Sequence, residues 1–143
     1  MKSVHIKVMG EPVAKGRPRF GRTRLGHVTV YSPQKTQDYE ALLRNEAIKA
    51  MGDQEPFDGA IGVTIKAFFA IPKSKSAKAK EIMDTGHHRV LKKPDIDNIQ
   101  KSVLDAFNGV VFKDDCMVWS IHAVKLYSSE PRIDVFVVCE DNK

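Results

Sequence analysis

Hydrophobic positions recur along this chain with two periods, and these periods predict its secondary structure. Residues 4–8 (VHIKV) alternate apolar and polar side chains, which predicts a β-strand. Residues 60–71 (AIGVTIKAFFAI) are more continuously apolar, as expected of a strand at the centre of a sheet. A short strand is predicted over residues 28–31. Two longer ones are predicted at about 117–127 and 133–140, joined by SSEPR as a hairpin.

Two segments have the spacing of helices. The first follows Ser32 and Pro33, which suit a helix start because serine caps and proline is tolerated at the first helical position. It is expected to run to about Met51, with Gly52 as its stop. The side chains predicted to be buried are Tyr39, Leu42, Leu43, Ala47 and Ala50.

The second helix is predicted over residues 97–108 and is closed by Gly109. At about 100° per residue, one face of this helix is polar and the opposite face is apolar. The polar face holds Asp97, Lys101, Asp105 and Asn108, and the apolar face holds Ile96, Ile99, Val103, Ala106 and Phe107. We expect the apolar face to pack on the sheet.

The remaining long segments are basic. Residues 10–26 are rich in Gly, Pro and Arg and are expected to form a basic loop. Residues 73–93 are expected to be a mobile basic segment, in which only residues 76–83 suggest a short helix. Together these elements predict one α+β domain over residues 1–143. It has a mixed, mainly antiparallel β-sheet and two principal helices.

Charge is unevenly distributed along the chain. Residues 2–49 hold ten Lys and Arg against four Asp and Glu, and residues 73–93 hold seven against two. From residue 95 to the end the balance reverses, with nine acids against five bases. A solvated surface with some charge asymmetry would explain these counts. Beside clustered carboxylates, however, the segregation favours a positive surface that guides phosphates.

Four aspartates have the most informative spacing. Asp95 and Asp97 are two residues apart, so an extended segment would place both on one side, where they could share a hard cation. Either could instead cap the following helix. Asp114 and Asp115 precede a strand. A turn there would bring one of them back toward the first pair, while the other caps or pairs locally.

A lysine follows the first acidic pair by one helical turn. Lys101 lies four residues after Asp97, at a spacing that suits an ordinary surface ion pair. The alternative is that Lys101 is held near a metal site, where it binds or polarises the scissile phosphate.

Several basic residues suit contacts with a nucleic-acid backbone. They are Lys15, Arg17, Arg19, Arg22 and Arg24 in the first basic segment and Lys73, Lys75, Lys92 and Lys93 in the second. Phe20 lies among the arginines and is either a wedge that stacks on an opened base step or a core anchor of its loop.

Other residue types exclude several kinds of protein. Cys116 and Cys139 have no CxxC spacing and are expected to be buried, reduced thiols. His87 and His88 are expected to be solvated or to contact phosphate. No GxxxxGK[ST] loop occurs, so no nucleotide cofactor is expected. No apolar run is long enough to span a membrane and the start lacks a signal-peptide pattern, so we expect a cytoplasmic protein.

The combination KPDIDNIQKSVLDAFNG, then KDDCMV, then Lys125 resembles the RusA-type Holliday junction resolvases, crossover-junction endodeoxyribonucleases that are common in prophages. The segments GEPVAKGRPR and YSPQKTQDYE are also similar to prophage members. The resemblance implies a RusA-like fold. By this resemblance Asp95, Asp97 and Asp115 would be essential carboxylates that bind Mg²⁺, with Mn²⁺ as a substitute. Asp114, the other member of the second pair, is a further candidate metal ligand. Lys101 would be the catalytic lysine.

The resemblance also implies the substrate and the assembly. Members act as homodimers on branched DNA, and they cut opposed strands of a four-way junction symmetrically during recombination and repair. Two alternatives remain at this point: a different structure-specific Mg²⁺-dependent nuclease, and a non-catalytic protein that binds branched DNA. Metal-dependent cleavage separates the enzymes from the binder, and a substrate panel separates the two enzymes.

Overall fold

A four-stranded mixed sheet forms the body of the protein. The computed structural model describes residues 1–85 and 88–141. The strand order is β1 (Lys2–Met9), β6 (Arg132–Glu140), β4 (Ala60–Ala70) and β5 (Val118–Ser128). β6 is antiparallel to both of its neighbours, whereas β4 and β5 are parallel. The predicted α+β class with a mixed, mainly antiparallel sheet is therefore confirmed.

The predicted hairpin between the last two strands is wrong. β4 lies between β5 and β6, so the turn after Ser128 carries the chain past the end of β4 to its far side. A short polar connection usually joins neighbouring strands, which is why the sequence favoured a hairpin. Here β4 is apolar enough to pair on both edges, and it separates the two strands.

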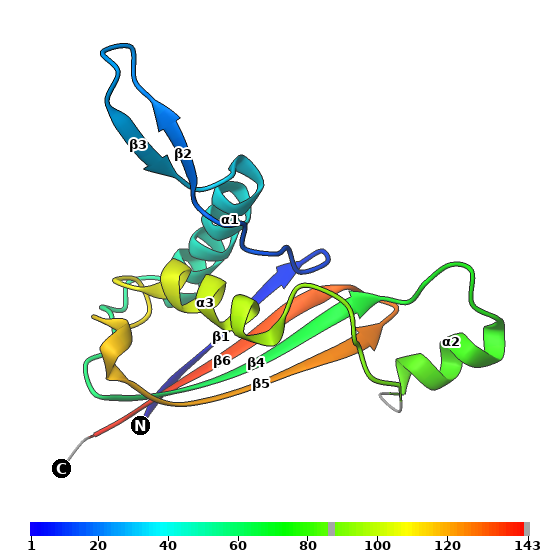
Figure 1. Ribbon diagram of the computed structural model, residues 1–143. Helices are drawn as coiled ribbons and strands as arrows, with labels where there is room; N and C mark the ends of the chain where they lie inside the picture. Colours follow the sequence, from blue (N-terminus) through cyan, green and yellow to red (C-terminus); the bar gives the residue numbers. More distant parts are fainter. Residues whose placement is uncertain (86–87, 142–143) are drawn as a thin grey trace.

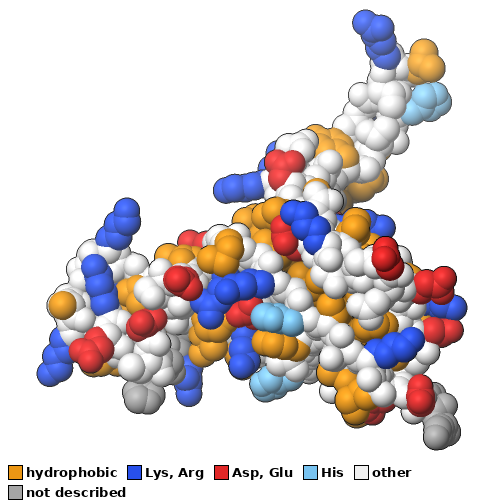
Figure 2. Space-filling view, turned by 180° about the vertical axis from the view of Figure 1, so that it is seen from behind, with side chains coloured by type: hydrophobic (Ala, Val, Ile, Leu, Met, Phe, Trp, Pro, Cys, Tyr) orange, Lys and Arg blue, Asp and Glu red, His pale blue; other side chains and the backbone are white. Residues whose placement is uncertain are grey.

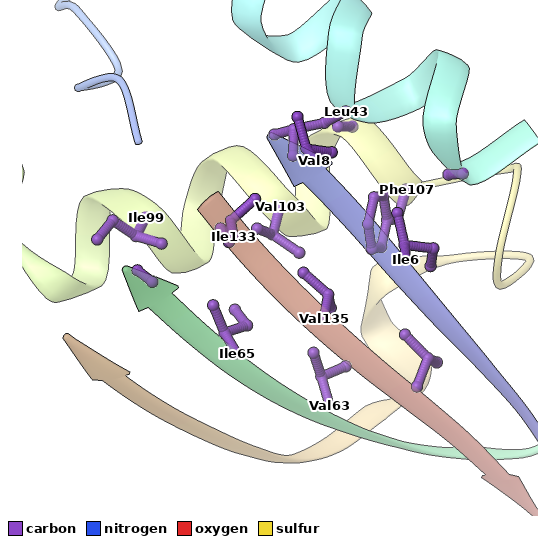
Figure 3. Packing of buried hydrophobic residues seen from close by; sticks show 14 of the residues in the cluster. Ile6, Val8, Leu43, Val63, Ile65, Ile99, Val103, Phe107, Ile133 and Val135 are labelled. Carbon is purple, nitrogen blue, oxygen red and sulfur yellow. The ribbon is translucent and has the colours of Figure 1, made fainter. Parts of the chain in front are cut away.

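Two helices cover one face of the sheet, as Figure 1 shows: α1 (Gln34–Met51) and α3 (Ile96–Phe107). Between them and the strands lies the core, where the side chains labelled in Figure 3 point toward one another from α1, α3 and the sheet. The inward-facing strand residues include Ile6, Val63 and Val135, all nearly or fully buried. Their spacing of two residues along each strand is the alternation that predicted the strands.

The helix faces are confirmed in large part. Tyr39, Leu43 and Ala47 of α1 are buried, and so are Ile99, Val103, Ala106 and Phe107 of α3. Leu42, Ala50 and Ile96 are exposed, contrary to prediction. Ile96 is the first residue of α3, where the helix begins beyond the covered part of the sheet.

The helix ends follow the predicted stops but not the predicted cap. α1 begins after Pro33, and no side-chain hydrogen bond caps it within the described residues, so Ser32 is not its cap. Gly52 and Gly109 follow α1 and α3 with φ of 56° and 80°, a backbone region that glycine enters without a steric penalty.

A β-ribbon extends away from the body; its second strand was predicted over residues 28–31 and is confirmed, but its first strand was not predicted. Residues 19–22 form β2 (Arg19–Arg22) rather than loop, and they pair antiparallel with β3 (Val28–Tyr31). Figure 1 shows this ribbon projecting beyond α1. We call residues 17–31 the arm. The arm has no alternating apolar face that the sequence could reveal, because neither of its strands contains a buried residue.

Two shorter elements complete the fold. α2 (Ala77–Asp84) confirms the short helix predicted within the second basic segment, and the Ser76 hydroxyl caps it by accepting a hydrogen bond from the Ala79 N–H. The one-turn 3₁₀ helix η1 (Asp115–Met117) precedes β5. Cys139 is buried as predicted, but Cys116 in η1 is exposed. No helix in the described ranges is long and apolar enough to cross a membrane.

Candidate active site

The first acidic pair lies at the N-terminal end of α3. Asp95 is the residue before the helix, with an extended backbone, and Asp97 lies in the first turn. Both are exposed, and Asp95 forms no side-chain cap bond. Within residues 1–85 and 88–141, neither carboxylate has a hydrogen-bond or ion-pair partner. The local fold therefore makes no use of either carboxylate as a cap, and both are available to a ligand.

Lys101 lies one turn further along the exposed polar face of α3. The surface ion pair with Asp97, one of two roles considered from the sequence, does not form among the described residues. The Lys101 ammonium is thus open to solvent, next to the exposed carboxylates on the same helix face.

The second acidic pair lies at the other end of α3. Asp114 Oδ1 accepts a hydrogen bond from the Cys116 N–H at 3.2 Å, so Asp114 is the member that caps locally, as expected of one of the two. This backbone hydrogen bond, aided by one with Asp115, lowers the pKa of Asp114. The hydrogen bond with Asp114 raises the pKa of Asp115, and the negative charges of Asp114 and Asp105 add to that shift.

The two acidic pairs are therefore separated rather than gathered. Asp97 lies in the first turn of α3 and Asp105 near its other end, eight residues further on, which corresponds to about 12 Å at ~1.5 Å per residue. The α3 carboxylate whose negative charge acts on Asp115 is Asp105, near the C-terminal end of the helix. In the described part of the chain, no group of three or more His, Cys, Asp or Glu is placed to hold a metal ion. The expected turn of Asp115 back toward the first pair does not occur within one protomer.

Lys15 is partly buried and is paired with two acidic side chains. Its side chain is 15% exposed, and its Nζ contacts a Glu40 carboxylate oxygen on α1 and Asp105 Oδ2 on α3, the latter at 3.1 Å. The contact of Glu40 with Lys15 could not be predicted from the sequence, because it depends on how α1 packs. A DNA contact by Lys15 stays a prediction, and these contacts give it another role.

The arm carries the other basic residues of its segment on an open surface. Arg17, Arg19, Arg22 and Arg24 are exposed, and Phe20 is 76% exposed. A core-anchor role for Phe20 is thereby excluded. Figure 2 shows the arm and the region of α2 as two projections that carry Lys and Arg side chains. Lys73 and Lys75 are exposed just before α2.

A pocket of about 420 Å³ lies beside Asp95, between the segment 11–14, the start of α1 and residues 92–94. Lys35, Lys92 and Lys93 line it. The Lys92 ammonium pairs with Glu11 at 2.9 Å and lies 5.6 Å from the ring centre of Phe69. Lys35 was not singled out by the sequence, since nothing in the helix pattern shows which surface lysine lines this pocket.

Lys125 and His88, both considered in the sequence analysis, lie outside the acidic pairs. Lys125, part of the motif, donates to the Lys92 carbonyl and lies 5.6 Å from the Phe69 ring centre, so it supports the wall of the pocket. The His88 ring lies 6.0 Å from that of Tyr127. His87 lies outside the described residues.

Comparison with known proteins gives a family match and a relative that span most of the chain. A family model described as endodeoxyribonuclease RusA matches residues 9–138. A Bacillus subtilis (strain 168) protein described as uncharacterized protein YqaN is 37% identical over 142 residues, which is 96% of each chain. The family match runs from the end of β1 into β6. It therefore includes both acidic pairs, Lys101 and the whole arm.

Proposed function

This chain belongs to the RusA endodeoxyribonuclease family, and from that premise we propose that it is a Mg²⁺-dependent resolvase of four-way (Holliday) DNA junctions. It acts as a homodimer and cuts two opposed strands symmetrically. The observation that carries this proposal is the exposed carboxylate pair at the start of α3, which has no hydrogen-bond or ion-pair partner among the described residues. Asp97 of this pair shares a helix face with Lys101, and the protein has a basic projecting arm.

The donor set fits Mg²⁺. Asp95 and Asp97 offer free carboxylate oxygens, and Mg²⁺ is commonly held by one or two carboxylates together with water and substrate phosphate rather than by a full protein cage. Asp95 and Asp97 would hold the ion, with Asp115 as a third ligand. When bound, Mg²⁺ supplies a counter-charge for the scissile phosphate and lowers the pKa of a water molecule.

The protein side chains bind and orient the substrate. Lys101 binds an oxygen of the scissile phosphate and neutralises the negative charge that develops there during the reaction. The arginines of the arm bind neighbouring phosphates and fix the position of the DNA. Phe20, exposed among them, stacks on a base where the junction is open.

The separation of the two acidic pairs supports the homodimer. A two-fold axis relates equal patches on two subunits, so residue i of one contacts residue j of the other and the reverse. A second copy with α3 running in the opposite direction would bring its Asp115 to the Asp95 and Asp97 of the first. Two such shared sites would face opposed strands of a junction, which itself has two-fold symmetry.

The test of the function is cleavage of a labelled static four-way junction, with Mg²⁺ and with EDTA. Wild-type protein is expected to give paired nicks at symmetric positions with Mg²⁺ only. Asp97→Asn is expected to abolish cleavage and keep or tighten junction binding, because less negative charge then faces the phosphates. Asp53→Asn, which removes the same charge from the exposed turn after α1, should cleave like wild type.

Three results would count against the proposal. Binding without cleavage by wild-type protein under all metal conditions would assign the chain to non-catalytic DNA binding. Cleavage of flaps or duplex ends in preference to the junction would assign it to another class of nuclease. Loss of folding in Asp97→Asn would show that this carboxylate supports the helix.

A further inference from the structure

Residue 15 joins three parts of the molecule at one point. The Lys15 ammonium contacts Glu40 on α1 and Asp105 on α3. Burial alone would lower the pKa of Lys15, but the hydrogen bonds and negative charges of Glu40 and Asp105 outweigh that effect and raise it. A charged ammonium therefore lies between the two helices, next to the base of the arm.

The backbone of the same residue is fixed by a side chain beside the acidic pair. Asn98 Oδ1 accepts a hydrogen bond from the Lys15 N–H, and Asn98 Nδ2 donates to the Lys15 carbonyl at 2.9 Å. Asn98 follows Asp97 directly in the first turns of α3. This two-point contact leaves little freedom for the chain at residue 15 to shift along the helix.

The next residue is fixed to α1. The Gly16 N–H donates to Thr36 Oγ1 at 2.7 Å, and Thr36 is 2% exposed. A Cβ at Gly16 would lie 2.6 Å from Pro33 Cγ, so only glycine fits against α1 here. The arm starts at residue 17, immediately after these contacts. Its base is therefore fastened to both helices, while its strands touch solvent on both faces.

We propose that Lys15 is a positioning residue for DNA cleavage. Together with Asn98 it fastens the base of the arm to the helix that carries Asp97 and Lys101. The distance between the DNA bound by the arm and the acidic pair is thereby fixed. This inference rests on the proposed nuclease function. Lys15 itself makes no phosphate contact in this role. It acts through the geometry of the arm and α3.

The test compares Lys15→Met with Lys15→Arg by single-turnover cleavage at saturating protein, and by junction binding in EDTA at several salt concentrations. Lys15→Met is expected to cut about 10- to 100-fold more slowly, and at several neighbouring phosphates, since small misplacements cost this much. Its junction Kd should stay within about threefold and keep the wild-type salt dependence, because no phosphate contact is lost. Lys15→Arg should recover the rate and the cleavage position.

Two control variants remove a positive charge elsewhere. Lys49→Met, at the exposed end of α1, should match wild type in every measurement. Arg22→Met, on the arm, should lower the slope of log Kd against log salt by about 1, as expected when one phosphate contact is lost. If Lys15→Met behaves like Arg22→Met, with a normal rate at saturation, Lys15 is a DNA contact and the inference is wrong. It is also wrong if Lys15→Met cuts at the wild-type rate and position.

As a control for folding, the thermal unfolding of each variant is measured. Removing Lys15 leaves the partly buried Glu40 carboxylate without its ion-pair partner, which lowers stability. If Lys15→Met does not fold, the double variant Lys15→Met/Glu40→Gln, which removes both charges of that pair, takes its place with the same expected result. Wild-type protein is assayed in parallel, so that failure of wild type to cut contradicts the proposed function rather than the role of Lys15.

Discussion

Two inactive variants should restore activity to each other when they are mixed. Asp97→Asn removes an acid in the first turn of α3, and Asp115→Asn removes one that lies beyond the opposite end of the helix, near Asp105. If each active site takes Asp97 from one subunit and Asp115 from the other, a mixed dimer holds one site with both changes and one site with neither. That second site is intact.

The expected magnitude follows from counting sites. Free exchange of subunits makes about half of the dimers mixed, and each has one intact site of two, so about a quarter of the wild-type sites return. These sites can nick one strand but cannot make the paired cut. The assay is a labelled four-way junction analysed on a denaturing gel for nicks and on a native gel for resolved duplexes. Nicks without resolved duplexes are expected.

The matched control mixes Asp97→Asn with Asp95→Asn, two changes at the same end of α3. Each site of that mixed dimer carries one change, so the mixture should stay inactive. Absence of nicks in the Asp97→Asn and Asp115→Asn mixture, with subunit exchange demonstrated, would refute the shared site. Each subunit would then have to rearrange to bring its own Asp115 to Asp97.

The remaining predictions concern Tyr39 and the arm. The Tyr39 hydroxyl is buried with no hydrogen-bond partner among the described residues, so Tyr39→Phe should keep or raise the free energy of unfolding, by up to about 1–3 kcal/mol, in urea titrations. Burial raises the pKa of Tyr39 in the folded protein. The neutral hydroxyl then contributes to the free energy of unfolding at lower pH, and this contribution is lost as the pH rises above the ordinary tyrosine pKa near 10. Wild type should therefore lose stability between pH 9 and 11 (approximate range) more than Tyr39→Phe does, and an equal loss would contradict this. Phe20→Ala should change the free energy of unfolding by less than about 0.5 kcal/mol, because Phe20 is 76% exposed, yet weaken junction binding by about 1–3 kcal/mol. Unchanged binding would mean that Phe20 does not stack on DNA.

The features that the sequence could predict are those with a local physical cause. The alternation that buries Ile6 and Val8 marks β1, and the apolar spacing of Ile99 and Val103 marks α3. The aspartates were recognised because their charges and spacing need no knowledge of the fold. Their chemical type was enough to suggest a metal-dependent reaction on a polyanion.

The features that the sequence could not predict depend on contacts between distant segments. The place of β6 between β1 and β4 depends on which apolar edges meet, and a period of two residues does not specify a neighbour. The first strand of the arm, β2, was not predicted because it buries nothing, and the pairing of β2 with β3 was not predicted for the same reason. The two hydrogen bonds between the Asn98 side chain and the Lys15 backbone join residues 83 positions apart. Nothing in the sequence around either residue predicts this contact. The distance of Asp115 from Asp97 became visible only once α3 was placed.

The order of strands has a consequence for how the chain folds in the cell. β1 pairs with β6, in a register that joins Lys2 to Cys139. β1 therefore cannot pair until residues 132–140 have been synthesised, and the sheet cannot close while only the earlier elements exist. Pairing of strands so far apart in sequence is slow to nucleate, because the chain loses the entropy of loop closure before the stabilising contacts form. We therefore expect α1 and its neighbours to collapse early, and the sheet to assemble only once β6 is available to pair with β1 and β4.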